Sequence, residues 1–266
     1  VEAVGWPLMG TFMGAVMLFS ALATIWAIKE PKEPEISLTD GFIRTFGEIL
    51  KEKTFLTALL PWTFFITGTS MVQGALVYYF AYIFGNEGLF QIALVALLFF
   101  SLACIPLWVK ISNKIGKKKS YMIGMTIMGV GVMAFSLLGP ILGATFGVVL
   151  MAICGIGLST HYVMPHAILP DIVEWDAHTK GKGRREGVYS SLWTFTSKLG
   201  QALALALNGW ILALVGYNST AITSLSRTGI ILLCGPLPLL WYVVGLSVIK
   251  HYPIDRAFYE AMISEA

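Results

Sequence analysis

Residues 188–215 form a long apolar run that nevertheless carries polar side chains able to take part in chemistry. A lysine near its middle is the unusual one, because a charge at the centre of a bilayer costs about 2.5–3.5 kcal/mol. Lys198 lies about 15 Å along a helix from the start of the run, too far for its side chain to reach the membrane surface. Its polar neighbours recur mostly three, four and seven positions apart, which predicts one polar stripe along a helix. The stripe comprises Ser190, Thr194, Ser197, Lys198, Gln201 and Asn208.

Two interpretations of Lys198 are open. It either packs against helix carbonyls without a function, or it faces a water-filled cavity or an acidic partner. We favour the second, with Ser190, Thr194 and Gln201 beside it in the cavity. No Asp or Glu lies well inside any other apolar run. An acidic partner is therefore expected outside these 266 residues.

Further candidates for the wall of a cavity lie on two other apolar runs. His161 and His166 flank Pro165 in a glycine-bearing segment, where a structural role and a pathway role are equally open for each histidine. Ser70 and Gln73 belong to a polar stripe in residues 55–84, and Trp193 could stack on the ring of a bound solute or simply pack between helices. The tyrosines of "YYFAY" fit either this cavity or an interfacial aromatic belt. They are Tyr78, Tyr79 and Tyr82.

Charges of both signs gather in "DIVEWDAHTKGKGRREG", residues 171–187. Opposite charges between two membrane spans can form ion pairs that close and open a cytoplasmic gate. The alternative is a solvated loop whose basic residues only set the topology. We favour the gate and assign four residues to it, which are Asp171, Glu174, Arg184 and Arg185.

The composition defines the elements that must position these groups. The chain is 56% hydrophobic and 12% charged, about half the charge of soluble domains, and its mean hydropathy is +0.75. A membrane span needs about 20 apolar residues. Seven runs meet this need, which predicts an all-α membrane protein and excludes a soluble one. They are residues 5–28, 55–84, 89–109, 121–138, 142–169, 188–215 and 228–249.

The basic residues predict the orientation in the membrane. Of 18 Lys and Arg, five fall in residues 29–54, five in 110–119 and four in 180–185. Basic connections are cytoplasmic by the positive-inside rule. We therefore expect a multi-pass protein of the plasma or inner membrane whose C-terminus is cytoplasmic.

Four parts are expected along the chain. Residues 1–28 form one helix, 29–54 a cytoplasmic linker with a short amphipathic helix, 55–250 a six-helix bundle and 251–266 a cytoplasmic tail that Asp255 could cap. The amphipathic helix lies on the membrane interface, or else packs on the domain in the cytosol. Because the chain begins at Val1 without a signal-peptide pattern, we interpret it as a piece of a larger protein. The three cysteines lack metal-ligand spacing, and we expect neither a metal nor a cofactor.

Several segments resemble the glycoside–pentoside–hexuronide:cation symporters, the melibiose permease family of the major facilitator superfamily. "DIVEWDAHTKGKGRREGVYSSLWTFTSKLGQAL" is similar to the family's hairpin and eleventh helix. "PLWVKISNKIGKKKSYMIG" is similar to the basic loop between helices 8 and 9, "YYFAYIFG" to the end of helix 7, and "YPIDRAFYEAMI" to the C-terminal segment.

The resemblance implies a fold and a function. Residues 1–28 would be the sixth helix and 55–249 helices 7–12, so the N-terminal half with its cation-binding carboxylates would be the missing partner. The family moves a sugar or glycoside, or in some branches a lysophospholipid, together with Na⁺ or H⁺. Lys198 and Thr194 match the family's helix-11 lysine and threonine, and Asp171, Glu174 and Arg185 would belong to the hairpin that closes the inward side.

Rival classes explain less. A seven-helix receptor or retinal protein fits the number of helices, but a retinal lysine belongs in the last helix and Lys198 is in the sixth run. A half-size transporter acting as a dimer would need its own cation ligands. An enzyme is disfavoured because no nucleophile triad or metal cluster is visible, and nothing indicates a nucleic-acid partner.

Overall fold

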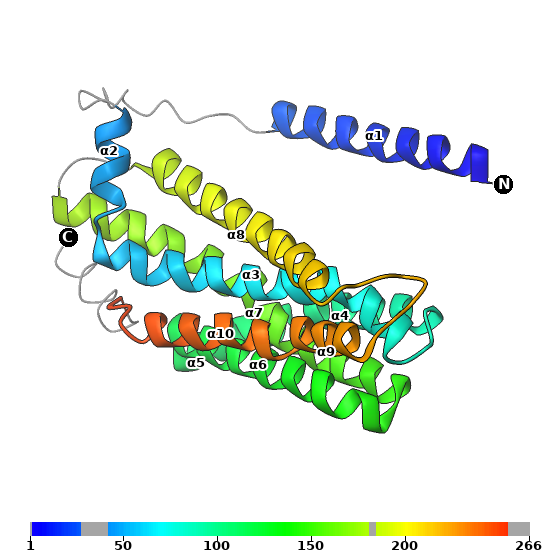
Figure 1. The fold of residues 1–266 in the computed structure, drawn as a ribbon. Helices are drawn as coiled ribbons and strands as arrows, with labels where there is room; N and C mark the ends of the chain where they lie inside the picture. The colour runs from blue at the N-terminus through cyan, green and yellow to red at the C-terminus, as the bar shows by residue number, and fades with distance from the viewer. Residues whose placement is uncertain (1, 28–41, 181–184, 255–266) are drawn as a thin grey trace. The chain divides into compact units, whose positions relative to one another are not determined.

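The computed structural model describes residues 2–27, 42–180 and 185–254 (Figure 1). Two compact units divide the chain, residues 1–39 and residues 40–266. The first contains one helix, α1 (Glu2–Ala27), whose 26 residues are almost all apolar. The long apolar side chains from Leu8 to Trp26 are exposed, as expected of a helix whose partners are lipid or another protein segment.

The second unit is a helical bundle, and no strand occurs in its described part. Its helices are α2 (Phe42–Ile49), α3 (Lys53–Tyr82), α4 (Gly88–Ala103), α5 (Ile105–Ile115), α6 (Lys117–Leu142), α7 (Ala144–Lys180), α8 (Glu186–Leu214), α9 (Ser224–Cys234) and α10 (Pro236–Ile249). The all-α prediction is confirmed. The expected amphipathic helix is α2, while the tail after Ile254, with Asp255, lies outside the described residues.

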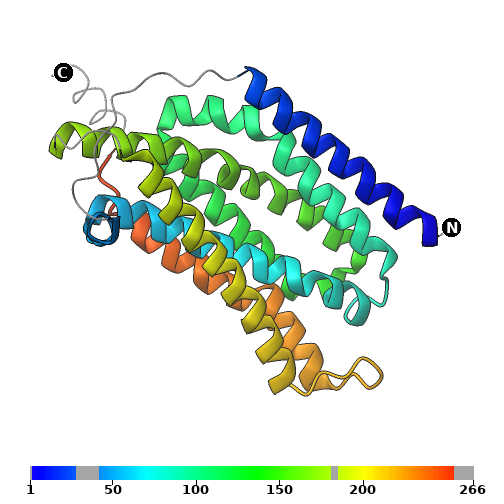
Figure 2. The same cartoon turned by 90° about the horizontal axis from the view of Figure 1, so that it is seen from above.

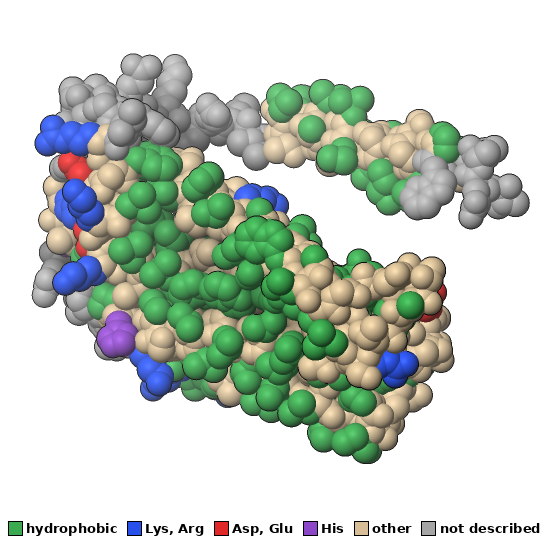
Figure 3. All heavy atoms as spheres, in the orientation of Figure 1, with side chains coloured by type: hydrophobic (Ala, Val, Ile, Leu, Met, Phe, Trp, Pro, Cys, Tyr) green, Lys and Arg blue, Asp and Glu red, His purple; other side chains and the backbone are tan. Residues whose placement is uncertain are grey.

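The long helices of this unit run alongside one another (Figures 1 and 2). Helix α3 packs between α8 and α10, whereas α7 packs along α4 and α6. Helix α8 contacts α3 far more than any other helix, so one of its sides is left open. In Figure 3, hydrophobic side chains cover the middle of the visible face, and charged ones gather at the end where α2 lies. This distribution suits a bundle whose middle lies in lipid.

Six of the seven predicted apolar runs are long and apolar enough to span a membrane. They correspond to α1, α3, α6, α7, the α4–α5 pair and the segment Ser224–Ile249. Helix α8 is not among them, although its 29 residues are long enough. The polar stripe around Lys198 explains the difference, because it lowers the hydropathy of the helix.

Two of the runs are broken, which the sequence analysis did not predict. Helices α4 and α5 meet at Cys104 with a bend of 45°, and α9 and α10 meet at Gly235. Pro106 and Pro236 each lie in the first turn after a break, where proline is tolerated because its missing N–H has no partner in a helix. By contrast, α7 continues through Pro165 and Pro170.

Replacing Gly157 with alanine is expected to destabilise the bundle by about 1–3 kcal/mol. A Cβ at this position would lie 2.8 Å from the backbone O of Gly124 and from the backbone N of Met128, so α6 and α7 would have to move apart. Gly209→Ala is the matched control, because nothing lies within 4 Å of its Cβ position. Unfolding midpoints in detergent should fall for the first variant only, and equal midpoints would contradict the close packing.

Candidate functional site

Lys198 lies on the open side of α8. Its side chain is exposed, as are those of Ser190 and Thr194, and Gln201 beside it is half-buried. The Lys198 Nζ donates a hydrogen bond of 3.4 Å to the Gln201 Oε1, while the described residues offer it no carboxylate. The ammonium group is about 18 Å along the helix from Glu186, near the middle of α8. The bundle thus presents a cation at mid-helix depth on a surface that it does not cover.

The predicted polar stripe is divided by the fold. Ser197 and Asn208 are buried against α3, where the Asn208 Nδ2 donates a 3.0 Å hydrogen bond to the backbone O of Met71. Gly200 lies on the same side, and a Cβ there would be 2.6 Å from the Thr67 Oγ1. Close packing on α3 therefore fixes the rotation of α8 and directs Lys198 away from the interface. Only Ser190, Thr194, Lys198 and Gln201 remain together as a candidate cavity surface.

Two α3 candidates lie on the outside of that helix. Gln73 is exposed and Ser70 is half-buried, whereas Thr67, one turn before, is buried and donates its hydroxyl to the Thr63 backbone O at 2.7 Å. The polar stripe of α3 is therefore also shared between packing and open surface. Gln73 and Ser70 stay available to a solute, and Thr67 does not.

An aromatic stack joins α3, α7 and α8. The Trp62 ring lies between His161, with centroids 4.3 Å apart and planes at 15°, and Trp193, at 5.4 Å and 18°. All three side chains are buried. In this conformation Trp193 and His161 pack between helices. For each of them this is the structural role, one of the two roles that the sequence analysis left open. His166 is exposed and directs its ring edge-on at Trp62, with centroids 5.3 Å apart.

The sequence analysis missed Trp62, which forms the centre of this stack. It directly precedes Thr63 in an apolar run, and nothing in its spacing distinguishes it from a lipid-facing tryptophan. Its role depends on histidines about one hundred positions away in the chain, which only the fold brings close.

The three tyrosines of "YYFAY" have different surroundings. Tyr79 is buried and donates its hydroxyl to the backbone O of Ser136 at 2.9 Å. Tyr78 and Tyr82 are half-buried and pack edge-on against Tyr217, whose hydroxyl donates to that of Tyr82 at 2.8 Å. Tyr79 is thus a packing residue, whereas the other two tie the end of α3 to the segment after α8.

A buried ion pair joins α7 to the start of α8. The Arg185 Nη2 and Nε donate to the Asp176 Oδ2 at 2.5 and 3.1 Å, and the exposed fractions of the two side chains are 6% and 1%. Burial alone would lower the pKa of Arg185, but its hydrogen bonds to Asp176 and the charge of that carboxylate outweigh this effect. The pKa of Arg185 is raised as a result, and its guanidinium group stays charged.

Further charges extend this pair to α2 and α3. The Arg185 Nη1 lies 3.6 Å from the Glu48 Oε2 on α2. The Lys180 Nζ lies 3.0 Å from the Asp176 Oδ1 and 2.5 Å from the Oε2 of Glu52, at the start of α3. We call this set the ion-pair cluster, comprising Glu48, Glu52, Asp176, Lys180 and Arg185. It fastens four helices of the same unit together.

Asp171 belongs to a different contact from the one expected. Its carboxylate oxygens accept hydrogen bonds of 2.8 and 2.6 Å from the Lys117 Nζ on α6, so its basic partner comes from the earlier basic segment and not from the hairpin. Glu174 is half-buried on α7, and Arg184 lies outside the described residues. Helix α7 continues to Lys180, so Asp171 and Asp176, five positions apart, lie on different sides of one helix and contact different neighbours.

Asp176 is the main residue that the predicted gate omitted. The signals were its spacing of four from Lys180, which fits a pair along one helix, and a basic residue just beyond. No three His, Cys, Asp or Glu side chains in the described part of the chain come together as a metal site requires.

Comparisons with known proteins place the chain among transporters. The family model described as MFS/sugar transport protein matches residues 1–256. The human "Sodium-dependent lysophosphatidylcholine symporter 1" is 23% identical over 248 residues, covering 91% of this chain and 45% of that protein. The "Glucuronide carrier protein homolog" of Escherichia coli K12 is 29% identical over 206 residues, covering 74% of this chain and 44% of the carrier.

A third relative, the "Uncharacterized symporter YjmB" of Bacillus subtilis 168, is 29% identical over 265 residues, covering 91% of this chain and 54% of that protein. The chain spans about half the length of the curated relatives it matches. These findings confirm the melibiose permease-like resemblance, and the matched family and relatives are transporters, not enzymes. The chain belongs to the MFS/sugar transport protein family of the major facilitator superfamily.

Proposed function

We propose that this chain is the C-terminal half of a cation-coupled symporter that carries a sugar or glycoside with Na⁺ or H⁺ by alternating access. The observation that carries the proposal is the exposed Lys198 at the middle of α8, with Ser190, Thr194 and Gln201 beside it. A cation at this depth is stable only against water or an acidic partner. In transporters of this kind the solute site lies near the midplane, between two rocking halves.

The remaining assignments follow from this proposal. Helix α1 is the last helix of the N-terminal half, and residues 55–250 form the C-terminal bundle. Ser70, Gln73 and His166 contribute to the solute cavity. Trp193 and His161 support the cavity wall from behind, because they are buried one layer inside it. The ion-pair cluster and the Asp171–Lys117 pair lie on the cytoplasmic side.

A lysophospholipid is the second candidate substrate. One relative that covers 91% of the chain is a lysophosphatidylcholine symporter, and large apolar side chains flank Lys198 on the open side of α8. Phe195 is 62% and Leu199 57% exposed. An amphiphile could lay its headgroup beside Lys198 and its chain along these residues. The family model, described as MFS/sugar transport protein, and the match to a glucuronide carrier homolog support a sugar as the first choice.

An uptake experiment on the complete transporter tests the proposal. Cells expressing it receive labelled β-glycosides, hexuronides and lysophosphatidylcholine, each with and without an imposed Na⁺ or H⁺ gradient. Gradient-dependent accumulation of a sugar supports the first choice and identifies the ion. Accumulation of the lipid alone supports the second, and accumulation of neither under any gradient would contradict the proposed symport.

A further inference from the structure

The basic segment 110–119 contains five lysines, and two of them have partners inside the protein. The Lys117 Nζ binds Asp171 and donates to the Ala167 backbone O at 3.0 Å. The Lys118 Nζ donates to the backbone O atoms of Lys250 and Tyr252, at 2.7 and 2.8 Å, beyond the end of α10. These two lysines hold the bundle together, so their presence is explained without a ligand.

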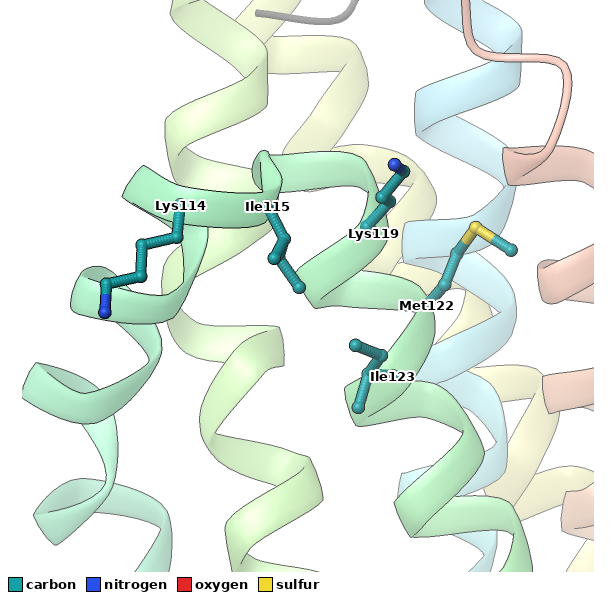
Figure 4. A pocket seen from close by; sticks show the side chains of 5 residues that line it. All are labelled: Lys114, Ile115, Lys119, Met122 and Ile123. Atoms are coloured by element: carbon teal, nitrogen blue, oxygen red, sulfur yellow. The ribbon is translucent and has the colours of Figure 1, made fainter.

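Lys114 and Lys119 differ from them. Both are exposed, and neither has a hydrogen bond or ion pair within the described part of the chain. They line the same pocket of about 510 Å³, formed where α5 ends and α6 begins (Figure 4). The other lining residues are Ile115, Met122 and Ile123. Two cations without partners among the described residues thus border a concave surface whose lining has no acidic side chain.

The turn between the helices creates this arrangement. Gly116 has a φ of +89°, a conformation that favours glycine, and it ends α5 directly before α6 starts. Lys119, Met122 and Ile123 are three and four positions apart, so they share one face of α6. In Figure 4, Ile115 and Ile123 are directed into the space between the two helices, with Lys114 on one side of them and Lys119 on the other.

The chemistry of the pocket is amphipathic. Ile115 and Ile123 are 39% and 43% exposed. Ile123 lies one turn beyond Lys119 toward the middle of α6, and Ile115 is the last residue of α5. The lysines stand at the end, where a basic segment meets the membrane surface. A soluble anion would satisfy the two ammonium groups but would leave the isoleucines against water. A lipid with an anionic headgroup satisfies both parts, because its phosphate meets the lysines while its acyl chain covers the isoleucines.

From this geometry we propose that the pocket between α5 and α6 binds an anionic phospholipid of the cytoplasmic leaflet. Lys114 and Lys119 attract the phosphate from the two sides of the pocket, through flexible side chains whose ammonium groups are directed apart in Figure 4, and Ile115 and Ile123 contact the first part of an acyl chain. Basic pockets between transmembrane helices on this side of a membrane are suited to anionic headgroups. The lipid would lie outside the solute cavity, so its binding does not depend on which substrate is carried.

Lipid titration of the complete transporter in detergent, read by native mass spectrometry, tests this site. The probes are phosphatidylglycerol and phosphatidylcholine with identical acyl chains. Lys114→Gln with Lys119→Gln should weaken phosphatidylglycerol binding about thirty-fold, since a lysine near an anionic lipid contributes about a factor of five. Phosphatidylcholine binding should be unchanged. Ile123→Ser should weaken binding of the same lipid several-fold without altering the charge.

The matched control is Lys110→Gln with Lys250→Gln. It removes the same charge from two exposed lysines that do not line the pocket, and phosphatidylglycerol affinity should fall less than two-fold. The melting temperatures of both double variants in lipid-free detergent should be the same, and this result would show that both are folded. The proposal would be overturned if the control variant bound phosphatidylglycerol as weakly as the pocket variant, because general charge attraction would then explain the binding. So would unchanged affinity in the pocket variant, or competition by inorganic phosphate at concentrations comparable to the lipid.

Discussion

Replacing Lys198 with alanine is expected to reduce cation-driven accumulation of the substrate by at least about thirty-fold, to near the background of cells without the transporter. Loss of one partner from a desolvated charge pair costs about 2–5 kcal/mol, which corresponds to this factor or more. Lys198 has no carboxylate among the described residues, so its acidic partner in the proposed cycle comes from the other half. Without the ammonium group, occupancy of the cation site would no longer be linked to that of the solute site.

The measurement compares accumulation with equilibrium exchange of the labelled substrate across the membrane. If Lys198 links the cation to the solute, exchange should be retained better than accumulation. Arg227→Ala is the control, because Arg227 is also an exposed, isolated basic residue but lies at the start of α9. Lys198→Arg keeps the charge and should retain part of the activity. Normal accumulation by the alanine variant, expressed and folded as well as the parent, would remove Lys198 from the mechanism.

Replacing Asp176 with alanine is expected to destabilise the bundle by about 3–5 kcal/mol. The single substitution leaves Arg185 charged, with only 6% of its side chain exposed and its two strongest hydrogen bonds gone. Glu48 at 3.6 Å replaces little of what is lost. Lys180→Ala should cost no more than about 1 kcal/mol, because Lys180 is 31% exposed, Glu52 remains 21% exposed, and Asp176 keeps its hydrogen bonds to Arg185.

A double-mutant cycle distinguishes this ion pair from packing. Asp176→Leu combined with Arg185→Met removes both charges at similar volume and should cost much less than Asp176→Ala alone. The coupling energy is obtained from unfolding midpoints in mixed micelles, measured for Asp176→Leu, for Arg185→Met and for the double variant. Additive losses in the cycle would show that the two charges do not stabilise each other, despite their 2.5 Å contact.

The helices themselves were largely predictable from the sequence, because long apolar runs can satisfy their backbone in lipid only as helices. The open position of Lys198 was also predictable, since burial of an unpartnered ammonium group would be too costly. The division of its stripe was not. In a helical projection all the polar residues of the stripe lie on one side, including Ser197, Lys198 and Asn208. The close contact between Gly200 and α3 decides which of them face inward, and the sequence does not reveal that contact.

At the charged end, the ion pairs could not be predicted from the sequence because their partners lie far apart in the chain. Asp171 pairs with Lys117, which lies 54 positions earlier, while several basic residues lie much nearer in sequence. The prediction of a hairpin gate assumed that α7 ended before the acidic residues. Because α7 instead runs to Lys180, Asp171 and Asp176 extend from one rigid helix toward different neighbours.

The breaks at Cys104 and Gly235 have a mechanical meaning for the bundle. Helices α3, α6, α7 and α8 each cross it as one continuous rod, so a tilt imposed at one end is transmitted to the other. The α4–α5 crossing is bent by 45° at Cys104 and the α9–α10 crossing is interrupted at Gly235, so neither is one continuous helix. A rigid-body tilt of α8 that moves Lys198 is therefore expected to move Arg185 as well, because Arg185 caps the N-terminal end of the same helix. The crossing that ends in α10 lacks this continuity, because its helix is interrupted at Gly235.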